Sequence, residues 1–305
     1  MAVTTTSVAA GGLGKIVGDA VIAFNKTNVM LPLVTAVQAV KGANTVQFPD
    51  YTKVASSSVR TNSDDAEGAD TSTITSITTA ARSATVGEHI IRADVTDLAR
   101  MGSADDIVGN TGDILGNAVG AKLDADLTAL GTGFSQTECG AGELLAISHV
   151  FGAMRQLRSA GAPFPYNLVL SAKQVWGPKG LISLTHNTAL DTAGSSTTDT
   201  ATARAIGVLG SKGEEALNTG MIGSFAGFDV YWSDQINENQ GGGGDAAGFA
   251  FSKGAIGLGI GSEGLFRLES QRDASKRATE YVAVGFWGEV EIKDAFGVYI
   301  LSDVS

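Results

Sequence analysis

A long polar segment between two strand-like stretches is the feature that most constrains how this chain can fold. Residues 55–73 are dominated by Ser, Thr and acidic side chains, which cannot bury enough apolar surface to offset the entropy lost on ordering. The flanking stretches carry alternating or β-branched apolar residues: Val46 and Phe48 before it, and Ile74, Ile77, Val86, Ile90 and Ile91 after it. The pattern predicts a long two-stranded projection. Since a monomer has little with which to hold such an arm, we predict that the protein assembles and that a neighbouring copy supports the arm.

Charge and composition exclude several classes of function. The 305-residue chain is 43% hydrophobic, so it can fold around a substantial core, and its net charge is −11. Such an acidic chain is not expected to grip nucleic acid or an anionic membrane, although DNA could still be a neighbour. The single cysteine, Cys139, excludes an intrachain disulfide framework and provides no thiolate cluster for a metal.

The N-terminal region shows no export or membrane signal. Its first residues lack the basic start and apolar run of a signal peptide, and no window approaches the roughly 20 apolar residues of a membrane span. We therefore expect synthesis in the cytoplasm. A short amphipathic helix is predicted from the three- and four-residue spacing of Leu13, Ile16, Val17, Ala20, Val21 and Phe24.

The clearest helix is predicted between Ser103 and Leu130. Ser103 is placed to cap it, and Gly131 to end it. The helical period is kept by Ile107, Thr111, Ile114, Leu115, Ala118, Val119, Leu123, Leu127 and Leu130. Glycines at 112, 116 and 120 lie one turn apart, which indicates either close packing against another element or curvature of the helix.

The second half of the chain alternates between helical and strand patterns. A helix is predicted from Ile147 to Leu157 and ends before Gly161-Ala-Pro. Buried strands are predicted at 166–171, 227–232 and 247–251, which makes this part an α/β lobe. Alternating apolar residues at 282–292 and a last strand at 297–301 then return the chain to β structure. Residues 265–269 pair with the first of these through a charged turn at 270–279, forming a long hairpin.

No pattern supports catalysis. His89, His149 and His186 are far apart in sequence and share no metal-ligand spacing, and no G-x-S-x-G nucleophile motif exists. Residues 259–264 match G-x-G-x-x-G, but a strand-like sequence follows where a dinucleotide site needs a helix. The acidic pairs at 64–65 and 105–106 are explained by solvation and helix capping. We expect no enzymatic activity, no cofactor and no metal.

The order of elements resembles that of major capsid proteins of tailed bacteriophages with the Hong Kong 97-like fold. The resemblance covers nearly the whole chain. Five short segments also resemble sequences of this family: Asn44-Thr-Val-Gln-Phe-Pro, Ala93-Asp-Val-Thr-Asp, Pro165-Tyr-Asn-Leu-Val-Leu-Ser, Ile222-Gly-Ser-Phe-Ala-Gly-Phe-Asp-Val-Tyr and Arg272-Asp-Ala-Ser-Lys-Arg-Ala-Thr. No single one of them is diagnostic, but together they leave few competitors.

The resemblance implies an α+β fold with four parts. These are an N-terminal arm (1–43), an extended loop lying on an adjacent subunit (44–97), a peripheral domain with the long spine helix and a β hairpin (98–135 and 256–292), and an α/β axial domain (136–255 and 293–305). It also implies intersubunit contacts through Ser56 and Arg60 of the loop, and through Arg272, Lys276 and Arg277 where capsomers meet. Lys53 is a conceivable but unsupported donor for the covalent crosslink that some members form.

The implied function is a shell of hexamers and pentamers that encloses double-stranded DNA without sequence-specific binding, as part of a virion made in a host bacterium. The implied partners are other copies of this chain, a separate scaffolding protein, a portal and, in some cases, a cement or decoration protein. Two alternatives stay open: a bacterial encapsulin-type nanocompartment shell, which would enclose enzymes instead of DNA, and a secreted surface-layer or adhesin protein, which would ordinarily need an export signal.

Overall fold

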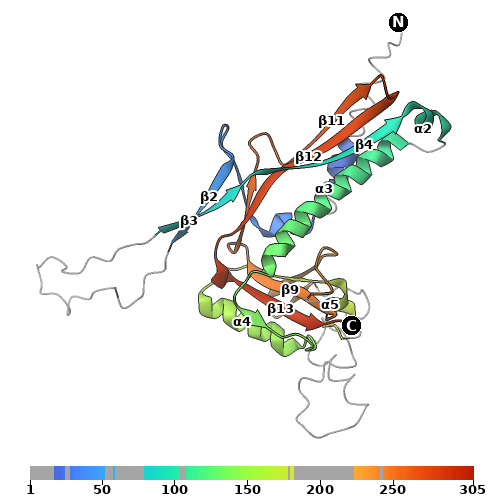
Figure 1. Cartoon of the computed structure of the whole chain (residues 1–305). Coiled ribbons are helices and arrows are strands. Elements are labelled where there is room, and N and C mark those ends of the chain that lie inside the picture. The colour runs from blue at the N-terminus through green and yellow to red at the C-terminus, as the bar shows by residue number, and fades with distance from the viewer. Residues whose placement is uncertain are drawn as a thin grey trace, which may run out of the picture.

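Two β sheets form the framework of the computed structural model, which describes residues 17–24, 28–51, 58, 79–103, 107–177, 179–181, 223–240 and 243–305. The elongated lobe holds a five-stranded sheet of β1 (Thr35–Gln38), β10 (Ile256–Ile260), β12 (Ala278–Glu291), β11 (Phe266–Asp273) and β4 (Gly87–Thr96). The α/β lobe holds six strands in the order β5 (Thr137–Glu138), β13 (Gly297–Asp303), β9 (Asp245–Ser252), β6 (Tyr166–Leu170), β8 (Phe228–Trp232) and β7 (Ser224–Phe225). Figure 1 shows the elongated lobe above the α/β lobe.

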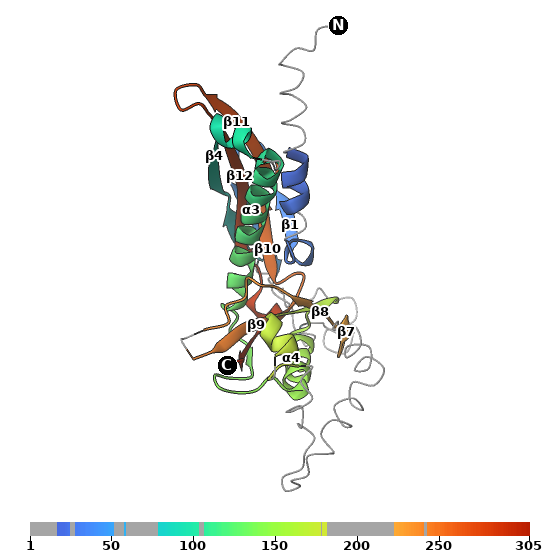
Figure 2. The same cartoon turned by 90° about the vertical axis from the view of Figure 1, so that its right-hand side faces the viewer.

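The long helix α3 (Ile107–Gly131) runs along the sheet of the elongated lobe (Figures 1 and 2). At 1.5 Å per residue it is about 37 Å long. Its end at Gly131 confirms the prediction, but Ser103 ends the short helix α2 (Asp97–Gly102), and residues 104–106 lie outside the described part. The buried face was also predicted partly wrongly, because Ile114 is exposed while Gly112, Gly116 and Gly120 are buried.

Close packing explains at least one of these glycines. The described residues of the N-terminal helix, 17–24, lie against α3, and a Cβ atom at Gly116 would stand 2.2 Å from the backbone oxygen of Ala20. A side chain there would push the two helices apart. Ala20 and Phe24 are accordingly buried with Leu115 and Val119 in the main core. The predicted close approach is therefore confirmed at Gly116.

The arm begins as a two-stranded hairpin of β2 (Thr45–Tyr51) and β3 (Thr79–Thr85), antiparallel in register from Thr45–Thr85 to Tyr51–Thr79. Figure 1 shows it pointing away from both lobes. The prediction for the returning leg was wrong beyond Val86: Ile90 and Ile91 belong to β4, which pairs with β12 over ten residues. The arm is consequently shorter at its base, because β4 is an integral strand of the elongated lobe.

Glycines in the sheet let the hairpin base lie on it. Val46, Phe48 and Ala84 are buried in a small core of their own. A Cβ at Gly259 would come 3.2 Å from Val46, and one at Gly288 would come 2.1 Å from the backbone oxygen of Thr85. The G-x-G-x-x-G match at 259–264 thus has a packing role, and β11 follows it, as the sequence indicated.

The α/β lobe follows its predicted elements closely. Helix α4 (Ile147–Ala160) ends at Gly161, whose φ of 73° is the left-handed conformation that closes a helix. It packs with α5 (Ala172–Trp176) on β6, β8, β9 and β13 around a second core. Two 3₁₀ turns, η1 (Leu31–Leu33) and η3 (Asp294–Phe296), complete the described elements. Among the described residues, no helix is both long enough and apolar enough to span a membrane.

One buried carboxylate joins three distant segments. Asp124 on α3 is 1% exposed; its Oδ1 accepts the N–H groups of Val29 at 3.1 Å and Met30 at 2.7 Å, and its Oδ2 accepts the Ser233 hydroxyl at 2.6 Å. Burial raises the pKa of Asp124, and the three donors oppose that rise. The N-terminal segment, α3 and the residue after β8 are therefore held at one point.

Candidate assembly surfaces

The far end of the elongated lobe presents a helix with no buried residue. Helix α2 exposes more than three quarters of both Leu98 and Met101, while Thr96 caps its N-terminus by accepting the N–H of Ala99. An isolated helix of six residues is marginal in water, and its two apolar side chains face solvent. We define the tip surface as α2 together with the turn between β11 and β12, which lies beside it in both views (Figures 1 and 2).

A bidentate ion pair between Arg272 and Asp97 fixes α2 to that turn. The guanidinium of Arg272 donates to both carboxylate oxygens of Asp97, each at 2.6 Å, and the backbone N–H of Asp97 donates to the oxygen of Arg277. Hydrogen bonds from Arg272 lower the pKa of Asp97. Arg272, predicted as an intersubunit contact, is therefore engaged within its own subunit.

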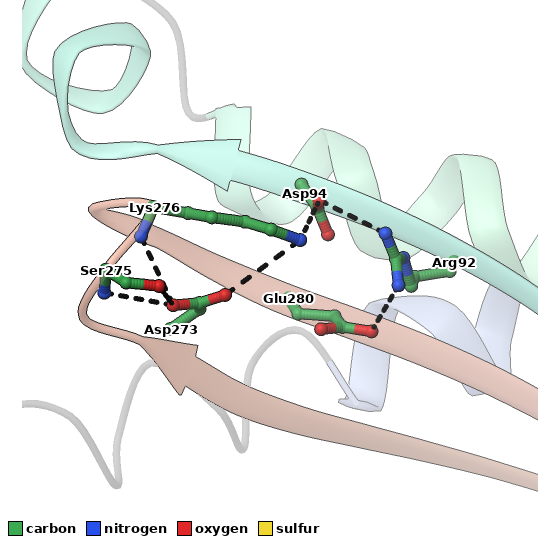
Figure 3. Close-up of polar contacts among 6 residues, drawn as sticks. All are labelled: Arg92, Asp94, Asp273, Ser275, Lys276 and Glu280. Atoms are coloured by element: carbon green, nitrogen blue, oxygen red, sulfur yellow. Dashed lines mark hydrogen bonds and ion pairs between the residues drawn. The ribbon is translucent and has the colours of Figure 1, made fainter.

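Lys276 belongs to a chain of charges along the same edge (Figure 3). Its ammonium lies 3.8 Å from Asp94 and 3.9 Å from Asp273, and Asp94 also lies 3.5 Å from Arg92, which reaches Glu280 at 3.2 Å. The Asp273 carboxylate in addition accepts the backbone N–H groups that shape the turn. These are exposed pairs, so each contributes about 0–1 kcal/mol to stability.

Arg277 differs from its two neighbours. It is exposed, its φ of 50° turns the backbone at the end of the hairpin, and its guanidinium has no ion-pair partner within the part of the chain that the structure describes. Its charge acts on Asp97 from beyond ion-pair distance. Of the three basic residues predicted to make contacts at this turn, Arg277 is the one that is held in no ion pair within the described residues.

The base of the arm is fixed to the elongated lobe by Lys293. Its ammonium lies 3.0 Å from Asp50, donates to the backbone oxygen of Tyr51 and stands 4.9 Å above the ring of Phe296. The Tyr51 side chain is exposed at the end of the described β2. The arm residues predicted to contact a neighbour, Ser56 and Arg60, and the crosslink candidate Lys53, lie outside the described residues.

Exposed aromatic residues mark the α/β lobe. Trp176 and Trp232 meet edge to face with ring centroids 5.6 Å apart, and each is about half exposed. The Phe151 side chain on α4 is exposed, and its ring centroid lies 6.3 Å from that of Phe225. Large aromatic groups in pairs at a surface are typical of sites that a partner covers.

The residues considered for chemistry lie in different places. His89 stacks on Trp287 with ring centroids 4.0 Å apart, and His186 lies outside the described residues. Cys139, Glu143 and His149 come together, which their sequence spacing did not indicate. Burial raises the pKa of the Cys139 thiol to about 11, so the sulfur is protonated at neutral pH and is not an activated nucleophile.

No protein-family model and no curated protein matches this sequence. Solved structures do match its fold. The capsid of the cyanophage P-SCSP1u superposes with a TM-score of 0.60 at 16% identity, covering 90% of this chain and 87% of that one. The capsid of a native GTA particle gives 0.56 at 10% identity, covering 90% and 89%. A virus-like particle from Pyrococcus furiosus gives 0.53 at 10% identity, covering 94% and 98%. The chain thus has the predicted Hong Kong 97-like capsid fold over nearly its full length.

Proposed function

We propose that this protein is a major capsid protein, which assembles with itself into the closed shell of a tailed bacteriophage. The observation that carries the proposal is the likeness, over about nine tenths of both chains, to subunits of phage and GTA capsids. A likeness that extends over so much of both chains supports a subunit of the same overall design as these shell proteins.

The surfaces support self-assembly. The arm leaves the molecule on a base held by Lys293 and a small core, α2 presents Leu98 and Met101 without cover, and the aromatic pairs lie on the α/β lobe. Burying apolar side chains contributes about 25 cal/mol per Å², so covering these groups against neighbouring copies favours assembly. Three sets of exposed groups on different parts of the chain suit a subunit that is contacted from several sides.

Hexamers and pentamers, double-stranded DNA as cargo, a separate scaffolding protein, a portal and a decoration protein are the finer parts of the proposal. The net charge of −11 supports a shell that does not bind the enclosed DNA tightly. The arm, shortened to 44–86 by the pairing of β4 with β12, the peripheral parts (87–135 and 256–292) and the axial parts (136–255 and 293–305) are proposed as the functional divisions of the subunit.

A nanocompartment shell, the alternative that the sequence left open, is not favoured by the matches, which include phage and GTA capsids. The two are separated by cargo. The chain should be expressed alone and together with the genes that adjoin its own, and the particles purified by sedimentation and treated with nuclease. Protected DNA of genome length supports the capsid, whereas a co-purifying enzyme in particles free of DNA supports the compartment. Absence of particles under both conditions contradicts both.

A further inference from the structure

A cluster of three different metal-ligand types lies where the α/β lobe begins. One ligand atom each from Cys139, Glu143 and His149 lies within 4.8 Å of the other two. The thiol and imidazole are half-buried, and the carboxylate is exposed. They come from the loop after β5 and from the first turn of α4. Sulfur, nitrogen and oxygen donors of this kind are those that zinc and similar ions prefer, whereas magnesium and calcium prefer oxygen alone.

The loop that carries these groups is held by backbone and side-chain bonds. The N–H of Gly142 donates to the Asp245 carboxylate at 2.9 Å, and the backbone oxygen of Glu143 accepts the N–H of Asp303 at 2.8 Å. Cys139 itself has a φ of 62°, a left-handed conformation that is unusual for a residue with a side chain. The loop that carries Cys139 and Glu143 is therefore held in place by its hydrogen bonds to β9 and β13.

The surroundings favour a cation. The charges that act on the sulfur come from Glu143, Asp245 and Glu138, all of them acidic, and the backbone oxygens of Glu143 and Leu144 lie 3.7 and 3.6 Å from it. A divalent ion would be attracted by each of these groups, since a bound cation reverses the local electrostatic preference. Glu138 is already engaged by Gln156 and Arg155, so it adds charge without being one of the ligands.

We propose that Cys139, Glu143 and His149 form a three-ligand site for a zinc-like divalent transition-metal ion, with a fourth position open to water. Two donors on one tetrahedral zinc stand about 3.5 Å apart, so small side-chain rotations would close the cluster. The thiol proton leaves to solvent when the sulfur binds. His149 Nδ1 now accepts the N–H of Ala146 at 3.2 Å. This bond is given up whichever ring nitrogen binds the ion, because binding through Nε2 would place the ring proton on Nδ1. The bound ion would fix the loop to α4.

Cobalt(II) is the spectroscopic probe for this site, and its use does not depend on whether the chain forms a shell. Untagged full-length protein, cleared of metal with a chelator, is titrated with cobalt(II). We expect one equivalent to produce a thiolate-to-cobalt charge-transfer band and the intense visible bands of a tetrahedral ion. Zinc should displace it, magnesium should not, and zinc should raise the melting temperature because it binds the folded state.

Single substitutions distinguish a metal site formed by all three residues from cobalt binding to the cysteine thiol alone. C139S should abolish the charge-transfer band, and H149Q and E143Q should each weaken cobalt binding by at least about tenfold. E263Q, at an exposed carboxylate far from the loop, is the matched control and should bind as the unaltered protein does. Circular dichroism checks that each variant is folded. Absence of the band in the unaltered protein, or a band of unchanged affinity in both H149Q and E143Q, would overturn the proposal.

Discussion

Asp124 offers the sharpest test of how the subunit is held together. Replacing it with Ala leaves the buried N–H of Met30, the half-buried N–H of Val29 and the buried hydroxyl of Ser233 without their acceptor. Each unsatisfied buried group costs about 1–3 kcal/mol, and relief from burying the carboxylate offsets part of the sum. We expect Asp124→Ala to lower the free energy of unfolding by about 2–4 kcal/mol, a large share of a typical total of about 5–15 kcal/mol.

Asp124→Asn is the matched variant. Its amide oxygen can accept both N–H groups, and its NH₂ can donate to the Ser233 oxygen, which reverses the direction of that bond and releases the hydroxyl proton. We therefore expect a loss of about 1 kcal/mol. Urea unfolding of the unassembled subunit, followed by tryptophan fluorescence and circular dichroism, measures both. An alanine variant as stable as the unaltered protein would refute the reasoning, and so would an asparagine variant as unstable as the alanine variant.

We also predict that stability depends on pH differently in the unaltered protein and in Asp124→Asn. Because the pKa of Asp124 is raised above 3.8 in the folded state, the folded chain holds a proton at this site in a range where the unfolded chain has lost it. Stability from this group is therefore greatest below pH 3.8 and falls as the pH rises through the folded-state pKa. Relative to Asp124→Asn, the unaltered protein should lose stability over that interval. A constant difference across it would contradict the assignment.

Three further perturbations address the arm and the tip surface. Gly288→Ala should displace the arm base and impair assembly, because its Cβ would strike a backbone oxygen of β3. Gly18→Ala, with open space around it, is the control and should assemble normally. Arg277→Glu should reduce particle yield, more at low salt, whereas Arg272→Glu should act mainly by releasing α2 from the turn. If sedimentation shows that both variants assemble as well as the unaltered protein, the tip surface is not a contact between subunits. Replacing residues 52–78 with an Asn-Gly turn, which suits the paired ends of β2 and β3, should preserve the melting temperature and abolish closed shells; a lost thermal transition would show that this segment belongs to the core.

Elements defined by local patterns could be predicted from the sequence. Helix α4 and strands β6, β8, β9 and β12 follow apolar periodicity bounded by glycine and proline, and they form where the pattern places them. The overall fold was also predictable, because the order of these elements resembles one known architecture. Local patterns sufficed wherever a segment's neighbours in space are also its neighbours in sequence.

Long-range contacts account for what the sequence did not show. β4 continues directly from the arm, and its alternating residues would suit pairing either with the other leg of the arm or with β12. Only tertiary packing decides that β4 pairs with β12. Ile114 fits the helical stripe, yet the buried face turns toward the glycines because the N-terminal helix occupies that side. Asp124 unites segments that are far apart in the sequence and whose approach depends on the finished fold. Cys139, Glu143 and His149 are close in the sequence, and the conformation of the loop between β5 and α4 brings them together. A side chain's partner across the fold leaves no periodic signal.

Electron cryomicroscopy of the purified particles tests the central claim most directly. The account predicts closed icosahedral shells in which the β2–β3 arm of each subunit lies on an adjacent copy and Arg277 faces a neighbouring subunit. Particles are to be prepared from the chain alone and with co-expressed phage proteins, because a scaffold is one of the proposed partners. A protein that stays monomeric under every such condition, or shells in which the arm touches only its own subunit, would contradict it.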